Sequence, residues 1–143
     1  MSSPLSHGLA GLWAGLVLGG SLVAAPAKFR APSLTLEVAL DVGRAQFFWL
    51  GVTEALLCGA LLLSLAFLAD RRWRWALLAT GILAFQRLVL MPPLDARTLQ
   101  LIAGEPAPES SLHTIYIAVE VAKFLLLVAM GCGVLKLTNR AQS

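Results

Sequence analysis

Four long apolar stretches dominate the chain and restrict how it can fold. They cover residues 5–25, 45–69, 75–91 and 115–137. A helix that crosses the hydrocarbon core of a bilayer needs about 20 mostly apolar residues. The stretches lack the alternation of polar and apolar residues that marks a membrane β-strand. The sequence therefore predicts an all-α integral membrane four-helix bundle that forms a single transmembrane domain over residues 1–143.

The composition agrees with a membrane protein and excludes several soluble classes. Apolar residues make up 58% of the chain and charged residues 13%, whereas about a quarter of a soluble domain is charged. This excludes a disordered chain, a nucleic-acid-binding domain and an ordinary cytosolic enzyme. We expect the lipid bilayer, and no nucleic acid, as a partner.

The first stretch has features of both a signal peptide and a membrane helix. Residues 21–27 read SLVAAPA, which offers small residues at a cleavage spacing. However, no Lys or Arg precedes the apolar run, and the run is longer than that of a usual signal peptide. We expect this helix to be retained.

The distribution of basic residues indicates an orientation. Loops that face the cytoplasm are enriched in Lys and Arg. Placing the turn after the second stretch in the cytoplasm puts five basic residues inside: Arg71, Arg72, Arg74, Lys136 and Arg140. Four then lie outside: Lys28, Arg30, Arg44 and Arg97. This predicts cytoplasmic N- and C-termini.

The segments between the stretches carry helix signals. Ser33 is a candidate N-cap for a short amphipathic helix that begins at Leu34, with Glu37 near the capping-box position. This helix is expected to lie on the membrane surface or to lead into the second span. Pro92 and Pro93 should end or sharply bend the third span. Ser110 or Ser111 is expected to cap the fourth.

Small residues recur at four-residue spacing in the first two spans. Gly11, Gly15 and Gly19 form one such stripe, and Gly51, Ala55 and Gly59 form another. Stripes of this kind let helix backbones approach closely in a membrane. The pattern favours packing of the first span on the second, and the alternative is a homo-oligomer contact through Gly11, Gly15 and Gly19.

Apart from Lys136 at the very end of the fourth span, four charged residues lie within the predicted spans: Glu54, Arg87, Glu120 and Lys123. Charges in the membrane are costly and usually face the bundle interior, where they find partners. At about 1.5 Å of rise per residue, all four fall in the outer half of the bundle. Glu120 and Lys123 lie one turn apart and can pair, while Arg87 can bridge to either glutamate. Gln86 lies about 100° around the helix from Arg87 and is not expected to join them.

The fourth span adds two polar residues on the same face. His113 and Tyr116 precede Glu120 and Lys123 at helical spacing and would lie at the mouth of a polar pocket. His113 with Glu120 is too few ligands for a metal site, and His7, at the opposite membrane side, does not suit haem ligation between helices. The sequence shows no catalytic triad, zinc motif or phosphate loop, so no catalytic residue, metal or cofactor is predicted.

The chain also resembles a known group of proteins. The residues that carry the resemblance are Pro26, Phe29, Pro93-Leu94-Asp95-Ala96-Arg97, Leu112-His113, Tyr116-Ile117 and Glu120-Val121-Ala122-Lys123. With these, the chain resembles small bacterial four-helix membrane proteins of unknown function, which are similar to the transmembrane-protein-205-like group. The resemblance implies a four-helix membrane domain in a bacterial inner membrane and gives no residue a catalytic role.

Two functions remain open at this point. The first is a non-enzymatic membrane protein whose polar pocket binds a small ligand or lipid, or which is an accessory subunit of a larger membrane complex. The alternative is a proton- or cation-coupled small transporter that works as an oligomer. The intramembrane charges themselves are either a structural ion-pair network or part of the pocket.

Overall fold

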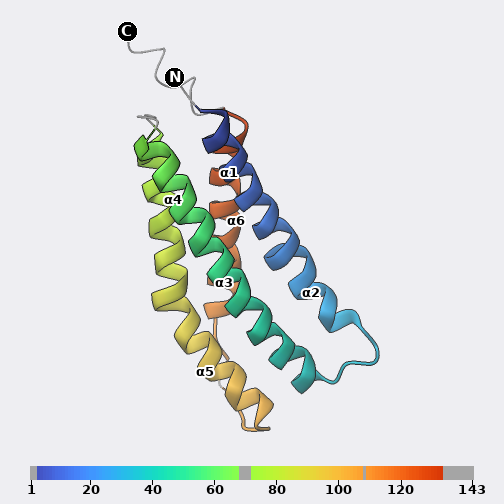
Figure 1. Ribbon diagram of the computed structural model, residues 1–143. Coiled ribbons are helices and arrows are strands. Elements are labelled where there is room, and N and C mark those ends of the chain that lie inside the picture. The colour runs from blue at the N-terminus through green and yellow to red at the C-terminus, as the bar shows by residue number, and fades with distance from the viewer. Residues whose placement is uncertain (1–2, 68–71, 108, 134–143) are drawn as a thin grey trace.

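The chain forms an all-α bundle of four long helices, as predicted. The computed structural model describes residues 3–67, 72–107 and 109–133. Within these residues, four helices are long and apolar enough to cross a membrane: Pro4–Arg30, Leu36–Phe67, Trp73–Ile102 and Leu112–Gly131. Figure 1 shows them side by side, with successive helices running in opposite directions. The predicted turn residues Asp70 and Arg71, and the C-terminal Lys136 and Arg140, lie outside the described residues.

The first and third spanning helices are built from several segments. The first consists of α1 (Pro4–Leu16), the π-helical η1 (Val17–Ala24), α2 (Ala25–Ala27) and the 3₁₀-helical η2 (Lys28–Arg30). The third consists of α4 (Trp73–Phe85), the π-helical η3 (Gln86–Leu90) and α5 (Met91–Ile102). The second and fourth are the continuous helices α3 (Leu36–Phe67) and α6 (Leu112–Gly131).

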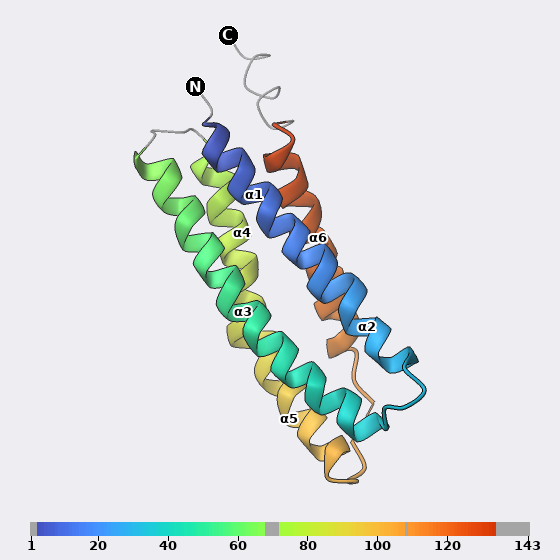
Figure 2. The same ribbon diagram turned by 45° about the vertical axis from the view of Figure 1, so that its right-hand side comes forward.

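The two ends of the bundle differ. At one end α1 begins, α6 ends and Arg72 lies between α3 and α4; we call this the arginine end (Figure 2). At the other end lie the segment between Arg30 and Leu36 and the segment between Ile102 and Leu112; we call this the loop end. The first and last described helices therefore start and finish at the same end of the bundle.

The amphipathic segment after the first helix leads directly into the second span. Helix α3 begins at Leu36, not Leu34, and Thr35 caps it in place of Ser33. The Thr35 hydroxyl accepts a hydrogen bond from the Val38 backbone N–H at 3.4 Å, and its carbonyl accepts one from Ala39 at 2.9 Å. Of the two predicted placements, the continuation into the span is therefore the one observed.

The third spanning helix does not end at Pro92 and Pro93. It changes direction there and continues to Ile102 as α5 (Figure 1). Proline removes a backbone donor from the helix, but the preceding turn, η3, is π-helical and already departs from the i→i−4 pattern. Of the two predicted outcomes at Pro92 and Pro93, a bend is therefore the one observed, and the helix extends beyond the predicted boundary at residue 91.

The connection from α5 to α6 is defined by local hydrogen bonds. Gly104 adopts a left-handed conformation with φ of 74°. Its N–H donates to the Leu101 carbonyl and that of Glu105 to the Gln100 carbonyl, which is the pattern of a Schellman cap. At the start of α6, the Ser110 hydroxyl accepts a hydrogen bond from the Leu112 N–H at 3.2 Å. Of the two predicted serine caps, Ser110 provides the side-chain bond.

The apolar core fills the half of the bundle toward the arginine end. Residues from all four spanning helices contribute to it: Ala10, Trp13, Ala14, Val17, Cys58, Leu61, Leu65, Ala76, Ala79, Leu83, Leu127 and Met130. The small side chains of α1 and α4 let the larger side chains of α3 and α6 fill the space between them. Buried Arg72 closes this end by donating to the Met130 carbonyl near the end of α6 at 3.1 Å. A cation at that position also complements the helix dipole.

The first span packs on the second, as the pattern predicts, but Gly11, Gly15 and Gly19 do not form the contact. A Cβ added at any of these three glycines would meet nothing within 4 Å, because their open sides face outward. The first span instead packs closely at two other glycines. A Cβ on Gly131 of α6 would lie 3.2 Å from the backbone nitrogen of Gly11, and one on Gly20 would overlap Leu50 of α3.

Candidate functional site: a buried charged cluster beside a cavity

Lys123 is the centre of a buried polar cluster that joins all four spanning helices. Its side chain is fully buried, and its Nζ lies 2.5 Å from Glu54 Oε1, 2.8 Å from Gln86 Oε1 and 2.9 Å from Glu120 Oε2. The ammonium group donates hydrogen bonds to Glu54 and Gln86, and its contact with Glu120 is an ion pair. The predicted pairing of Glu120 with Lys123 is present as part of this larger network.

Gln86 is a central member of the cluster, contrary to the sequence expectation. It is 1% exposed, and its Nε2 donates to Glu120 Oε2 at 2.6 Å while its Oε1 accepts from Lys123. Gln86 and Arg87 point about 100° apart around their helix. Both still belong to the cluster, because it extends from this helix toward α6 on one side and toward α3 on the other. Gln86 reaches α6, and Arg87 reaches α3.

Arg87 occupies the side of the cluster toward α3. Its Nη1 donates to the Phe47 carbonyl at 2.8 Å, and its Nη2 lies 3.5 Å from Glu54 Oε2. A Cβ on Gly51 would overlap the Arg87 guanidinium, so glycine at this position makes room for the arginine. The second predicted small-residue stripe therefore accommodates a charged side chain at its first position.

The two glutamates differ in how completely they are bonded. Glu54 receives a hydrogen bond from the Trp13 indole Nε1 at 3.0 Å in addition to its contacts with Lys123 and Arg87. Glu120 Oε2 receives Lys123 and Gln86, but Glu120 Oε1 is buried and has no hydrogen-bond partner. The cluster contains two carboxylates and two cations, so its formal charges balance, yet one acceptor remains open.

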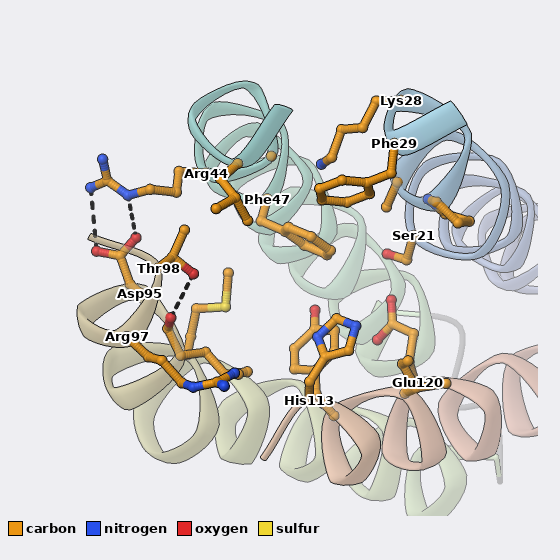
Figure 3. A pocket seen from close by; sticks show the side chains of 18 of the residues that line it. Ser21, Lys28, Phe29, Arg44, Phe47, Asp95, Arg97, Thr98, His113 and Glu120 are labelled. Carbon is orange, nitrogen blue, oxygen red and sulfur yellow. Dashed lines mark hydrogen bonds and ion pairs between the residues drawn. The ribbon is translucent and has the colours of Figure 1, made fainter. Parts of the chain in front are cut away.

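A cavity of about 440 Å³ lies between the cluster and the loop end (Figure 3). Its walls come from the end of the first helix, the first half of α3, α5 and the start of α6. The apolar part of the wall includes Leu22, Phe29, Leu40, Phe47, Met91, Leu94, Leu101 and Ile117. Glu120 belongs to this wall as well, so it is shared between the cluster and the cavity.

Two polar bridges frame the cavity near the loop end. Lys28 donates to Gln46 Oε1 at 3.1 Å, and Gln46 Nε2 donates to the Gly20 carbonyl at 2.7 Å. Gly20 belongs to the π-helical η1, and its carbonyl also accepts a hydrogen bond from the Ala25 backbone N–H. On the other side, Arg44 Nε pairs with Asp95 Oδ1 at 2.7 Å and links α3 to α5 (Figure 3).

Three of the four predicted pocket residues on α6 reach the cavity. His113, Tyr116 and Glu120 line it, and Figure 3 shows the His113 ring and the Glu120 carboxylate extending from the same helix into that space. The buried Tyr116 ring also packs edge-to-face on Phe47, with ring centroids 5.7 Å apart. Glu54, Arg87 and Lys123 lie behind this wall in the cluster.

The cluster lies near the middle of the bundle. Helix α3 begins at Leu36 rather than near residue 45, so Glu54 is about 27 Å from the loop end of its helix and about 20 Å from the other end at 1.5 Å per residue. The cavity, not the cluster, occupies the half toward the loop end. Sequence reasoning missed Trp13, Gln86 and Lys28, of which Gln86 had the clearest signal as an amide inside an apolar span.

Among the described residues, no group of three His, Cys, Asp or Glu side chains is arranged to hold a metal ion. No protein-family model, curated protein or solved structure matches this chain. Its function is therefore inferred from the cluster and the cavity.

Proposed function

We propose that this chain is a non-enzymatic membrane protein that binds a small, largely apolar ligand or lipid in the cavity at the loop end. The main support is the combination of an apolar wall, a volume of about 440 Å³ and a buried oxygen of a wall residue, Glu120 Oε1, that has no hydrogen-bond partner. Ligand pockets in proteins are mostly apolar, measure roughly 300–1,000 Å³ and contain a few polar groups that orient the ligand.

In this proposal the charged cluster has a structural role. Its members hold the four helices in register, because each buried charge requires partners on neighbouring helices. The cluster also forms the closed inner boundary of the cavity. Glu120 connects the two roles, since one of its oxygens is held by the cluster while the other is available to a ligand.

The alternative of a proton- or cation-coupled transporter has less support. Lys123 and Arg87 already balance both carboxylates, whereas a carrier site for a proton or cation needs a carboxylate that can exchange its counterion. If Glu54→Gln abolished a proton-gradient-dependent uptake without unfolding the protein, the transporter would become the better proposal.

The proposal also covers the protein partners of the first helix and the orientation of the chain in the membrane. The outward-facing Gly11, Gly15 and Gly19 leave a smooth face on the first helix, where a second copy or a subunit of a larger membrane complex would pack. The resemblance to small bacterial membrane proteins favours a bacterial inner-membrane location, and the basic residues favour cytoplasmic termini, which would place the cavity toward the outer face.

The proposal is tested by identifying what the protein retains. The full chain is extracted from native membranes into nanodiscs, and mass spectrometry identifies the small molecules and proteins that remain with it. Leu94→Trp fills the cavity wall, and Leu88→Trp, at a side chain that is 76% exposed, is the matched control. We expect a retained molecule that is lost in Leu94→Trp and kept in Leu88→Trp. Retention that is unchanged by Leu94→Trp would contradict the proposal.

A further inference from the structure

The open acceptor on Glu120 restricts which ligand the cavity can take. Glu120 is 1% exposed, and Oε1 has no hydrogen-bond partner, while Oε2 accepts a hydrogen bond from Gln86 and forms an ion pair with Lys123. A buried acceptor without a donor is destabilising, and more so when it carries charge. A ligand that brings a hydrogen-bond donor to this oxygen would remove that cost, so a donor group is the first requirement.

The charges around the cavity exclude a charged donor. The wall contains three basic residues, Lys28, Arg44 and Arg97, against the two acidic residues Asp95 and Glu120. A cationic ligand would be repelled by the basic residues and would upset the balanced charges of the cluster. An anionic group at Glu120 would be repelled by the carboxylate itself, and it would supply no donor.

The rest of the wall specifies an apolar body. Aromatic side chains from two helices, Phe29 and Phe47, lie on one side, and aliphatic side chains such as Leu94 and Ile117 complete the surface. Burial of apolar area against such walls would supply most of the binding free energy. The single hydrogen bond to Glu120 would fix the orientation of the ligand.

We therefore propose that the cavity binds a neutral alcohol or phenol with an apolar body, whose hydroxyl group donates to Glu120 Oε1. This inference rests on the proposed function and narrows it to one ligand class.

The test compares probes that differ only in the donor. Equilibrium dialysis against nanodiscs, with empty nanodiscs subtracted, measures the binding of 4-hexylphenol, of 4-hexylanisole, in which a methyl group replaces the hydroxyl hydrogen, and of the cation 4-hexylbenzylamine. A hydrogen bond to a charged acceptor corresponds to about a tenfold difference in affinity. We expect 4-hexylphenol to bind about tenfold more tightly than either of the other probes.

The two glutamates of the cluster provide matched variants. Glu120 lines the cavity and Glu54 does not, although both contact Lys123. Glu120→Gln should bind phenol and anisole within about twofold of each other, because an amide oxygen is a weaker acceptor. Glu54→Gln should keep the tenfold preference. If Glu120→Gln does not fold, the wild-type preference, together with its loss in Leu94→Trp, locates the hydroxyl in the cavity.

The outcomes separate this inference from the proposed function. Equal binding of phenol and anisole that Leu94→Trp abolishes would overturn the donor requirement and leave the cavity as a ligand site. Tightest binding of the amine would also overturn the inference. Binding that Leu94→Trp does not change for any probe would contradict the inference and the cavity site together.

Discussion

The two halves of the bundle solve the problem of buried polarity in opposite ways. Toward the arginine end, small and large apolar side chains fill the space, and Arg72 finds a backbone carbonyl. Toward the loop end, the helices diverge around a cavity, and polar side chains bridge its edges. The charged cluster separates the halves. The comparison indicates that stability resides in the filled half, whereas the open half is where we propose that a ligand binds.

The largest effect is expected when the cluster loses its central cation. Lys123→Met leaves Glu120 without a cation and Glu54 with Arg87 alone, and an unpaired buried charge costs about 3–5 kcal/mol. Denaturant titration in mixed micelles measures the free energy of unfolding. Lys28→Met, at a partly buried lysine in the open half, is the matched control and should change that free energy by less than about 1 kcal/mol.

A double variant tests whether Glu120 and Lys123 interact directly. Because Glu120→Gln removes the carboxylate that Lys123→Met leaves without a cation, the double variant should be less destabilised than the sum of the two single variants. The free energies of unfolding of all four proteins complete the cycle. Strict additivity would contradict direct coupling between Glu120 and Lys123.

An intermediate effect is expected at the close approach of α1 and α6. Gly131→Leu must displace the Gly11 backbone, which a Cβ would approach to 3.2 Å, and overpacking of this kind costs about 1–3 kcal/mol. Gly15→Leu meets open space and should leave the stability of the monomer unchanged. Cross-linking in membranes would detect whether Gly15→Leu weakens a homo-oligomer. A large loss of monomer stability in Gly15→Leu would contradict the outward placement of the stripe.

The smallest effect is expected at the ion pair that frames the cavity. Asp95→Asn removes the carboxylate that Arg44 contacts at 2.7 Å, but both side chains are about one-third exposed or more. Exposed pairs contribute roughly 0–1 kcal/mol. Thermal unfolding followed by tryptophan fluorescence should therefore show a small shift. If Asp95→Asn lowered the melting temperature as much as Lys123→Met does, the open half would contribute as much stability as the cluster, which would contradict the comparison.

The sequence was sufficient to predict the helices and the identity of the intramembrane charges. Span length depends on composition, and the cost of Glu54, Arg87, Glu120 and Lys123 in lipid requires that they find partners. Both the length of an apolar stretch and the presence of a charge within it can be read from the sequence without knowing how the helices pack. The prediction that His113 and Tyr116 share the face of Glu120 followed from helical spacing alone.

The features that were missed depend on how helices are placed relative to one another. Gln86 joins Arg87 because α3 and α6 lie on either side of the third helix, and Trp13 reaches Glu54 across the bundle. The Gly11, Gly15 and Gly19 stripe faces outward because Gly131 and Gly20 make the close contacts instead. Helical spacing shows which residues share a face, but it does not show which face meets which neighbour.

The central claim is that one half of the bundle is open and the other is filled, and two serines test it directly. Ser21 lines the cavity, whereas Ser64 is buried in the filled half and donates to the Leu61 carbonyl. Ser21→Cys and Ser64→Cys are made separately in a background in which Cys58 and Cys132 are replaced by serine, and the rate of reaction with a small water-soluble thiol reagent is measured in nanodiscs. We expect fast labelling of Ser21→Cys, slowed when Leu94→Trp fills the cavity, and negligible labelling of Ser64→Cys. Equal labelling rates at the two positions would contradict the division of the bundle into a filled half and an open half.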